Sequence, residues 1–287
     1  MVAKLFELAE SPLFYNGGYF WVDIIEGVIY LSEDVEALNS AKAAFELDEN
    51  ISNLVTCINK RILATGERSI YVYDLEANTR ALVNTFDDWN LSIRCNDGCV
   101  GADGKYWFGT MEKAPSGLNG RLYSMDSKGL LVDQDAEIGI PNSFIWLDER
   151  FVLISDSLLQ KTFKVELLES GKLDWVNRKI WLDLSHTNGT PDGGTLDAEG
   201  NVWIAVWGDA SIHKYSPDAL LLEKIELNAL QPTSCAFGGV NMDELLITTA
   251  TEGMSDEQLR MYPDSGKVML KKMDVKGKFL PVFNLEV

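Results

Sequence analysis

The amino-acid sequence predicts an all-β fold made of six similar units, and three observations carry this prediction. Long amphipathic helical patterns are scarce. Most apolar runs are short or alternating and end at Gly, Asp or Asn, a pattern typical of strands joined by turns. One short apolar run recurs along the chain at a nearly constant spacing.

The recurring run has two bulky apolar residues followed by small or polar ones. It occurs as "WVDI" at 21, "LATG" at 63, "WFGT" at 107, "LISD" at 153, "WIAV" at 203 and "LITT" at 246. The intervals are 42, 44, 46, 50 and 43 residues, and each leaves room for about four short strands, as in a β-propeller blade. The sequence therefore predicts a six-bladed β-propeller as a single domain over 1–287. A two-sheet sandwich, the alternative, would not need a constant period.

The remaining elements follow from the runs in chain order. After most runs comes a turn and a second strand-like run, at 27–31, 68–74, 120–126 and 211–216. A small residue at the third position of the run suits an inner strand, where blades crowd the channel. Asp34–Leu47 fits either a helix or a loop, and the segment "GKFLPVFNLEV" (277–287) offers a strand that can pair with early strands and close the ring.

Composition excludes several classes of protein. The net charge is 25 − 44 = −19, and such a surface repels phosphate backbones and anionic lipids, so neither nucleic acid nor membrane is an expected partner. No run reaches the roughly 20 apolar residues of a membrane helix.

The N-terminal stretch lacks a signal-peptide pattern, and four cysteines do not make a disulfide framework. A cytoplasmic protein is therefore expected. Oligomeric state is not readable from the sequence.

Polar residues recur at one phase of the repeat. A step of 11 residues back from each run gives Glu10, Ser52, Asn96, Asn142, Asp192 and Cys235. Equal phase in a propeller means equal radius and height, so the four carboxylates and carboxamides would ring one mouth of the channel. This all-oxygen set suits Ca²⁺ first, then Mg²⁺ or Mn²⁺. Hydrogen bonding in turns before strands is the alternative reading of these residues.

Other motifs carry weaker signals. Cys95 and Cys99 are interpreted as two isolated thiols, and "GADGK" (101–105) and "DAEGN" (197–201) as hairpin turns. Neither His186 nor His213 lies at the shared phase, which disfavours zinc. The sequence has no Walker loop and no Gly-x-Ser-x-Gly elbow, which disfavours a serine hydrolase.

Five blocks resemble the gluconolactonase/regucalcin (senescence marker protein) family. They are "AESPLF" (9–14), "RCNDGCVGADGKYWFGTM" (94–111), "IPNSFIW" (140–146), "GTPDGGTLDAEGNVWIAVWG" (189–208) and "PTSCAFGG" (232–239). The resemblance implies a six-bladed propeller with one divalent metal in its channel and hydrolysis of sugar lactones. By matching position, it implies that Glu10, Asn142 and Asp192 are metal ligands. It further implies that Arg94 contacts substrate and that Asn96 contacts metal or substrate.

The sequence departs from that family in three places. Ala9 and Ser143 stand where the family has glycine, and Ala114 stands where some members have a glutamate, with Glu112 nearby. The loop 111–121 is therefore expected to set substrate specificity. The role of Asp97 stays open between turn hydrogen bonding and support of the site.

The expected chemistry is attack of water on a lactone carbonyl. A divalent cation, with Ca²⁺ expected and Mn²⁺, Mg²⁺, Zn²⁺ and Fe²⁺ left open, polarises the carbonyl or activates the water. Asp192 is the predicted general base. Arg94 and Asn96 are two residues apart, so on an extended segment they face the same side. A non-catalytic Ca²⁺-binding regulatory propeller is the first alternative, and a protein-interaction propeller is the second.

Overall fold

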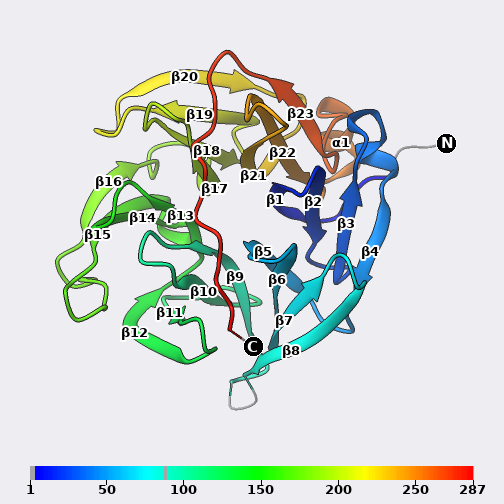
Figure 1. Ribbon diagram of the computed structural model, residues 1–287. Coiled ribbons are helices and arrows are strands. Elements are labelled where there is room, and N and C mark those ends of the chain that lie inside the picture. The colour runs from blue at the N-terminus through cyan, green and yellow to red at the C-terminus, as the bar shows by residue number, and fades with distance from the viewer. Residues whose placement is uncertain (1–3, 87–88, 287) are drawn as a thin grey trace. The chain divides into compact units, whose positions relative to one another are not determined.

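A computed structural model describes residues 4–86 and 89–286. Most of the regular structure in these residues is β-strand, arranged in six antiparallel sheets (Figure 1). The chain divides into two compact units. Unit 1 joins the N-terminal segment up to Ile51 with His186–Phe279, and unit 2 joins Ser52–Ser185 with Leu280–Val287.

Unit 1 holds three sheets whose strands follow one another in chain order. The first contains β1 (Ala9–Tyr15), β2 (Gly18–Asp23), β3 (Val28–Ser32) and β4 (Lys42–Glu46). The second contains β17 (Thr190–Leu196), β18 (Val202–Trp207), β19 (Ser211–Tyr215) and β20 (Leu221–Glu226). The third contains β21 (Gln231–Gly238), β22 (Glu244–Ala250) and β23 (Met269–Lys272), with the short helix α1 (Asp256–Met261) between the last two.

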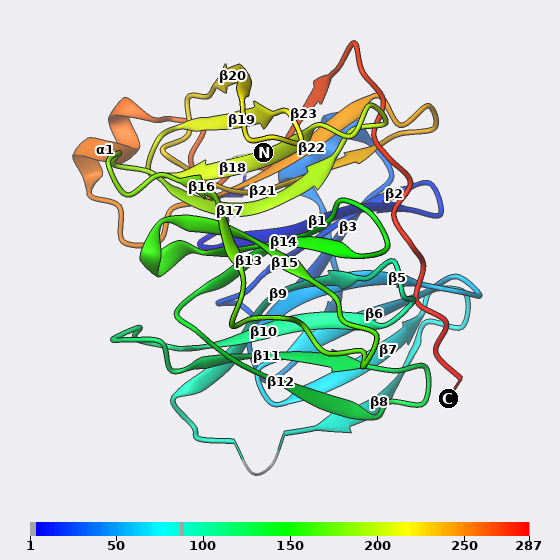
Figure 2. The same cartoon turned by 90° about the vertical axis from the view of Figure 1, so that its left-hand side faces the viewer.

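Unit 2 holds the other three sheets, again with strands in chain order (Figure 2). The first contains β5 (Ile51–Cys57), β6 (Arg61–Gly66), β7 (Ser69–Asp74) and β8 (Thr79–Thr85). The second contains β9 (Ile93–Val100), β10 (Tyr106–Glu112), β11 (Gly120–Met125) and β12 (Leu131–Ile138). The third contains β13 (Pro141–Trp146), β14 (Phe151–Asp156), β15 (Lys161–Glu166) and β16 (Lys179–Asp183), with the 3₁₀ turn η2 (Ser157–Leu159).

The recurring run forms the second strand of every sheet, namely β2, β6, β10, β14, β18 and β22. Its tryptophans Trp21, Trp107 and Trp203 are almost fully buried. The small third residue has a packing reason at Gly109, where an added Cβ would lie 2.3 Å from the Cβ of Pro141 on β13. The run is therefore fixed by close approach of the next sheet, and the polar residues that precede it lie on the first strands.

Asp34–Leu47 is neither a continuous helix nor a loop, which corrects the prediction for this segment. The Asp34 side chain accepts a hydrogen bond from the Glu36 N–H and starts the 3₁₀ helix η1 (Val35–Ser40). The chain then extends at Ala41 and continues as β4, which pairs with β3. Pairing with a neighbouring strand, which local sequence does not reveal, decides the second half.

A register shift interrupts the first strand next to the polar residues that share a phase. The shift lies between Glu10 and Leu13 in β1, between Asn142 and Ile145 in β13, and between Pro191 and Gly194 in β17. In β9 it falls opposite Gly109, around Asn96 and Asp97. A bulge breaks the strict alternation of a strand and re-aims the side chains beside it. These strands therefore carry their polar residues at irregular, specially directed positions.

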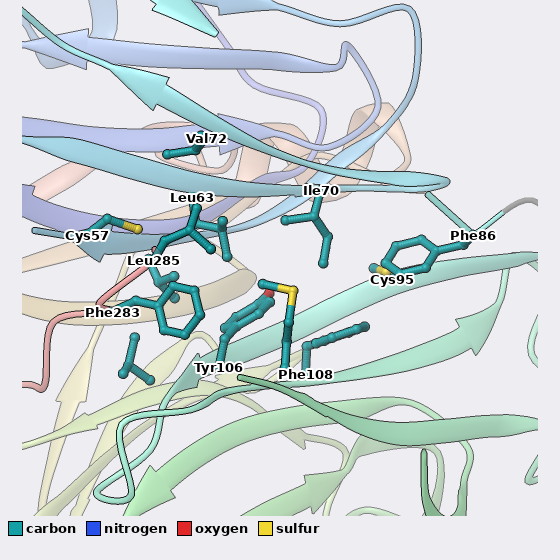
Figure 3. Close-up of a cluster of buried hydrophobic side chains, with 13 residues drawn as sticks. Cys57, Leu63, Ile70, Val72, Phe86, Cys95, Tyr106, Phe108, Phe283 and Leu285 are labelled. Atoms are coloured by element: carbon teal, nitrogen blue, oxygen red, sulfur yellow. The ribbon is translucent and has the colours of Figure 1, made fainter. Parts of the chain in front are cut away.

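The segment Leu280–Val287 contributes to the core of unit 2, but its described residues do not form the predicted strand and pair with β5 only through one isolated bridge. Phe283 forms a parallel bridge with Cys57; its N–H donates to the Thr56 carbonyl at 2.8 Å, and its own carbonyl accepts from the Ile58 N–H at 3.0 Å. Figure 3 shows Phe283 and Leu285 inside a cluster of apolar side chains from β5, β6, β7, β9 and β10. Burial in this cluster anchors the segment.

The two predicted hairpin turns and the cysteines are as expected. Asp103 accepts from the indole Nε1 of Trp107 at 2.9 Å, and Asp197 accepts from that of Trp203 at 3.1 Å. Each carboxylate therefore fastens a turn to the tryptophan of the following strand. All four cysteines are free thiols, which confirms the reading of Cys95 and Cys99 as isolated.

Candidate functional site

Unit 2 brings together three of the predicted site residues. Arg94 and Asn96 lie on β9 and Asn142 lies on β13. The Arg94 Nη1 donates to the Asn96 Oδ1 at 2.6 Å, and the Asn96 Nδ2 donates to the Asn142 Oδ1 at 3.0 Å. Asn96 also donates to the Pro141 carbonyl at 2.9 Å. The three side chains thus form one hydrogen-bonded row across two sheets.

The bonds of this row fix the orientation of both carboxamides. The Asn142 Nδ2 donates to the Ser157 Oγ at 2.9 Å, which leaves its Oδ1 to accept from Asn96. Because a carbonyl oxygen has two lone pairs, the Asn142 Oδ1 can accept from Asn96 and still offer a lone pair to a cation. The Asn96 oxygen already faces the positive guanidinium of Arg94. This arrangement favours Asn142 over Asn96 as a metal ligand.

Unit 1 holds the two predicted carboxylate ligands, each next to β21. The Ser11 N–H donates to the Glu10 Oε2 at 2.7 Å, with Ser11 at a positive φ of 50°. Burial, with a further contribution from the charge of Glu10, raises the pKa of the Cys235 thiol on β21. Glu10 therefore lies within electrostatic reach of that strand.

Asp192 is buried, with 8% of its surface exposed. Its neighbour Gly193 lies so close to β21 that an added Cβ would be 2.2 Å from the Ser234 Oγ and 3.0 Å from the Ser234 Cα. Only glycine fits there, so the β17 backbone beside Asp192 is held at one distance from β21. The carboxylate is therefore presented by a tightly packed strand.

The two remaining positions of the shared phase have structural partners. The Ser52 hydroxyl donates to the Thr65 carbonyl at 3.3 Å, and the Cys235 thiol donates to the Trp203 carbonyl at 3.8 Å. The next residue of the β5–β8 sheet, Asn53, contacts β9 instead: its Nδ2 donates to the Asp97 Oδ1 at 3.2 Å. Sequence reasoning missed Asn53, and a step of ten residues instead of 11 would have found it.

Asp97 makes both a local hydrogen bond and contacts with a neighbouring strand. Its Oδ1 accepts from the Gly98 N–H at 2.7 Å, a local bond within β9. Its carboxylate also accepts from the backbone N–H groups of Ser143 and Phe144 on β13. Burial raises the pKa of Asp97 to about 6 although these hydrogen bonds oppose the shift. Asp97 therefore connects the two strands that carry Asn96 and Asn142.

The loop between β10 and β11 is held by its own acidic residue. The Glu112 Oε2 accepts from the Ser116 N–H at 2.9 Å and from its hydroxyl at 2.8 Å. Hydrogen bonds from Asn119 and Ser116 lower the pKa of Glu112. Lys113 ties the loop to neighbouring segments, because its N–H donates to the Ser92 carbonyl at 2.8 Å and its Nζ to the Glu67 Oε1 at 2.6 Å.

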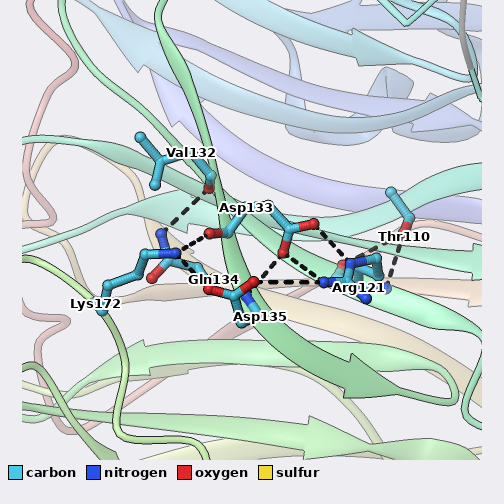
Figure 4. A network of polar contacts seen from close by, with 7 residues as sticks. All are labelled: Thr110, Arg121, Val132, Asp133, Gln134, Asp135 and Lys172. Carbon is cyan, nitrogen blue, oxygen red and sulfur yellow. Dashed lines mark hydrogen bonds and ion pairs between the residues drawn. The ribbon is translucent and has the colours of Figure 1, made fainter.

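The far end of that loop is braced by an ionic network (Figure 4). Arg121 donates its backbone N–H to the Thr110 Oγ1 at 3.0 Å, and its Nε lies 2.7 Å from the Asp133 Oδ2. Lys172 in turn lies 2.7 Å from Asp135, which is itself 3.8 Å from Arg121. Because Thr110 pairs with Cys95 on β9, the network supports the strand just before Asn96.

The donor set fits a hard cation by its chemistry. Over 4–86 and 89–286, no three His, Cys, Asp or Glu side chains lie together so as to hold a metal ion. The predicted ligands are two carboxylates and one carboxamide, so this finding does not bear on them. Oxygen donors of these kinds are the ones that Ca²⁺ takes. In the same described ranges, no helix is long and apolar enough to cross a bilayer.

With six sheets of repeated strand order, the protein is a six-bladed β-propeller, as predicted. Its residues 8–251 match the family model described as "SMP-30/Gluconolactonase/LRE-like region". The chain therefore belongs to the SMP-30/gluconolactonase/LRE-like family, which confirms the resemblance seen in the sequence.

Individual relatives are similar in sequence or structure to nearly the whole of this chain. An uncharacterized protein of Sulfolobus acidocaldarius is 30% identical over 94% of this chain and 94% of its own. A protein of Rhizobium meliloti (strain 1021), provisionally named a sugar lactone lactonase, is 27% identical over 97% of this chain and 94% of its own. The crystal structure of a calcium-binding protein, regucalcin, from Agrobacterium tumefaciens has a TM-score of 0.89 at 26% identity, covering 98% of this chain and 95% of that one.

Proposed function

We propose that this protein hydrolyses a sugar lactone, of the aldonolactone type, to the corresponding sugar acid with the help of one divalent cation. Membership of a family with a relative named a sugar lactone lactonase supports the reaction class. The observation that carries the proposal is the row Arg94–Asn96–Asn142, in which Asn96 links a guanidinium to the oriented carboxamide oxygen of Asn142. A substrate contact next to a cation ligand is what such a reaction needs.

Glu10, Asn142 and Asp192 would hold the cation, and Ca²⁺ is our choice by donor type. This assignment rests on their shared repeat phase and on the matching family blocks. When bound, the cation polarises the lactone carbonyl and lowers the pKa of a nearby water. The residues of the chain then act on substrate and proton.

Asp192 acts as general base: it takes the proton from the attacking water and gives it to the ring oxygen when the acyl C–O bond of the lactone breaks, a role suited to a carboxylate on a rigid strand. Arg94 binds sugar hydroxyls and then the carboxylate formed on ring opening, since a guanidinium can donate two parallel hydrogen bonds. Asn96 holds Arg94 in place through its Oδ1. The loop 111–121 selects among lactones, and its Glu112, occupied within the loop, does not replace the glutamate that some family members have at the position of Ala114.

A metal-exchange experiment tests the proposed function. The protein is stripped with chelator and assayed on a panel of aldonolactones with Ca²⁺, Mn²⁺, Mg²⁺, Zn²⁺ or Fe²⁺ restored. We expect turnover that disappears with chelator and returns with one or more cations. No rate above spontaneous hydrolysis for any pair of lactone and cation would defeat the proposal.

A second candidate is a Ca²⁺-binding regulatory propeller without turnover. It is favoured by one observation, the similarity to a crystal structure described as a calcium-binding protein. Tight Ca²⁺ binding together with no hydrolysis in the same panel would select it.

For either function we propose one propeller domain and a cytoplasmic location. The location is proposed because all four cysteines are free thiols, as in a reducing compartment.

A further inference from the structure

A second row of buried polar side chains, distinct from Arg94–Asn96–Asn142, crosses the first two sheets of unit 2 and has no part in the proposed chemistry. It consists of Thr65, Tyr106, Asn53 and Asp97. The hydroxyls of Thr65 on β6 and Tyr106 on β10 are 2.6 Å apart. The Tyr106 hydroxyl donates to the Asn53 Oδ1 at 3.0 Å. The Asn53 Nδ2 donates to the Asp97 Oδ1 at 3.2 Å and to the Gly98 carbonyl at 2.9 Å. Thr65, Asn53 and Tyr106 are at most 2% exposed.

The hydrogen bonds of this row all run in one direction. A phenol has one proton, and Tyr106 gives it to Asn53, so the Thr65 hydroxyl must be the donor in its bond to Tyr106. That bond orients Tyr106, and Tyr106 in turn orients the carboxamide of Asn53. The NH₂ group of Asn53 is therefore directed at Asp97, and a flipped amide would face the tyrosine proton with a donor.

The row ends at the strand that carries Asn142. On its far side, Asp97 accepts from the N–H groups of Ser143 and Phe144, the two residues that form the bulge of β13 after Asn142. Ser143 has a positive φ of 50°, a strained conformation for an L-residue. The two hydrogen bonds to one carboxylate offset that strain and hold the bulge.

We propose that Asn53, Tyr106 and Asp97 are positioning residues for Asn142. They touch neither cation nor substrate. They fix the two peptide groups after Asn142, and those peptide groups fix the direction in which its carboxamide oxygen is offered. The proposal rests on the proposed function, in which Asn142 is a ligand. Partners behind a ligand commonly change metal affinity or activity 10–100-fold when they are removed.

The test uses variants that keep shape and remove one bond each. Tyr106→Phe deletes the hydroxyl that orients Asn53, Asn53→Leu deletes both ends of the amide, and Asp97→Asn replaces one acceptor oxygen by a donor. Tyr73→Phe on β7, another fully buried tyrosine of unit 2, is the matched control. Val72→Ala, a loss of buried apolar volume in the same strand, shows what lowered stability alone does.

Two measurements read out the variants. Hydrogen–deuterium exchange of the metal-free protein follows the amides of 141–146, and calorimetric titration gives the Kd for Ca²⁺ and Mn²⁺. We expect faster exchange of 141–146 and a Kd raised about 10–100-fold in Tyr106→Phe and Asn53→Leu. Tyr73→Phe should match the wild type in both, and Val72→Ala should match it in Kd. A merely structural role would lower the melting temperature and leave the Kd of the folded protein unchanged.

The outcomes separate this proposal from the proposed function. Folded Tyr106→Phe and Asn53→Leu with wild-type exchange at 141–146 would overturn the positioning role, whatever the activity. Faster exchange with an unchanged Kd would also overturn it, because Asn142 would then not depend on the bulge. If the wild type itself binds none of the five cations of the metal-exchange experiment, the proposed function fails, and the exchange data on the metal-free protein still decide whether the row holds the bulge.

Discussion

The amide nitrogen of Asn96 lies 3.0 Å from Oδ1 of Asn142, and this bond joins the first strands of two neighbouring sheets. Arg94 bonds to the other end of Asn96, and Ser157 accepts from the other end of Asn142. Neither amide can rotate without losing a buried hydrogen bond, which costs on the order of 1–3 kcal/mol. The orientation of the two groups is therefore a property of the fold before any ligand arrives.

Asp192→Asn should abolish turnover while substrate still binds. The carboxamide has nearly the shape of the carboxylate but cannot accept a proton, so a general base is lost at a cost of about 10²–10⁴ in kcat. Steady-state kinetics with saturating cation measure kcat and KM separately. Asp218→Asn, at an exposed turn of the same unit, is the control. Near-wild-type hydrolysis by Asp192→Asn would remove Asp192 as the base.

Arg94→Lys should weaken substrate binding and leave cation binding intact. Lysine keeps the charge but lacks the planar guanidinium, whose Nη1 bonds both Asn96 and the Cys95 carbonyl. Loss of a charge-assisted hydrogen bond predicts a KM raised about tenfold or more. Kinetics and cation titration are compared with Arg80→Lys, an exposed position on β8. A weakened cation Kd with an unchanged KM would instead assign Arg94 to the metal site.

Phe283→Ala should strongly destabilise the protein, and Phe279→Ala should not. Phe283 is fully buried in the cluster of Figure 3, whereas Phe279, four residues earlier in the chain, is 81% exposed. Removing a buried phenyl ring costs about 3–5 kcal/mol, and an exposed substitution changes stability by about 0.5 kcal/mol or less. Urea unfolding measures both. Equal effects would mean that the segment is not anchored through Phe283.

Because of His213, the free energy of unfolding should fall when the pH drops below the ordinary pKa of a histidine side chain, about 6.5. Its ring nitrogens contact Tyr215 at 2.8 Å and Asp209 at 3.0 Å, and Lys224 and Glu226 complete its charged surroundings. Burial lowers the pKa of His213, although Asp209 opposes the shift. The unfolded chain, with a histidine pKa near about 6.5, therefore binds the proton more readily than the folded protein. The contribution is fully present above that pH and is lost below it.

The measurement is the free energy of unfolding of the wild type and His213→Gln at several values between pH 7 and pH 5. The difference between them should change with pH by at most about 1.4 kcal/mol per unit. The chain has only two histidines, so His186→Gln, at an exposed loop position, is a complete control and should follow the wild type. A difference that is constant over this range would contradict the neutral, buried state of His213.

The fold was predictable because its signal is repeated. The second strand of each sheet has the same pattern, bulky apolar residues followed by small or polar ones. The run therefore occurs six times in the sequence. Asp34–Leu47 was not predictable, since its second half becomes a strand only through pairing with β3. The division of the chain into two units, with 280–287 belonging to the middle of the sequence, leaves no periodic trace.

Residues of the candidate site could be named from the sequence where their residue type and position in a motif were enough to single them out. Arg94, Asn96 and Asn142 were named from spacing and family blocks, and unit 2 places them in one row. Asn53 was missed because a fixed step of 11 residues lands on Ser52, and the bridging role of Asp97 was not predictable because it depends on contacts between sheets. The bulges also defeat a fixed count, since one extra residue in a strand shifts the phase by one.

The anchoring of Phe283 has a consequence for synthesis of the protein. Domains tend to fold from the N-terminal side as the chain emerges from the ribosome. Unit 2 takes its first 134 residues from 52–185 but completes its core only with residues 280–287. Its apolar cluster therefore stays open while roughly a hundred residues of unit 1 are still being made (186–279). During that time the apolar cluster of unit 2 is exposed to solvent at the place that Phe283 and Leu285 later fill.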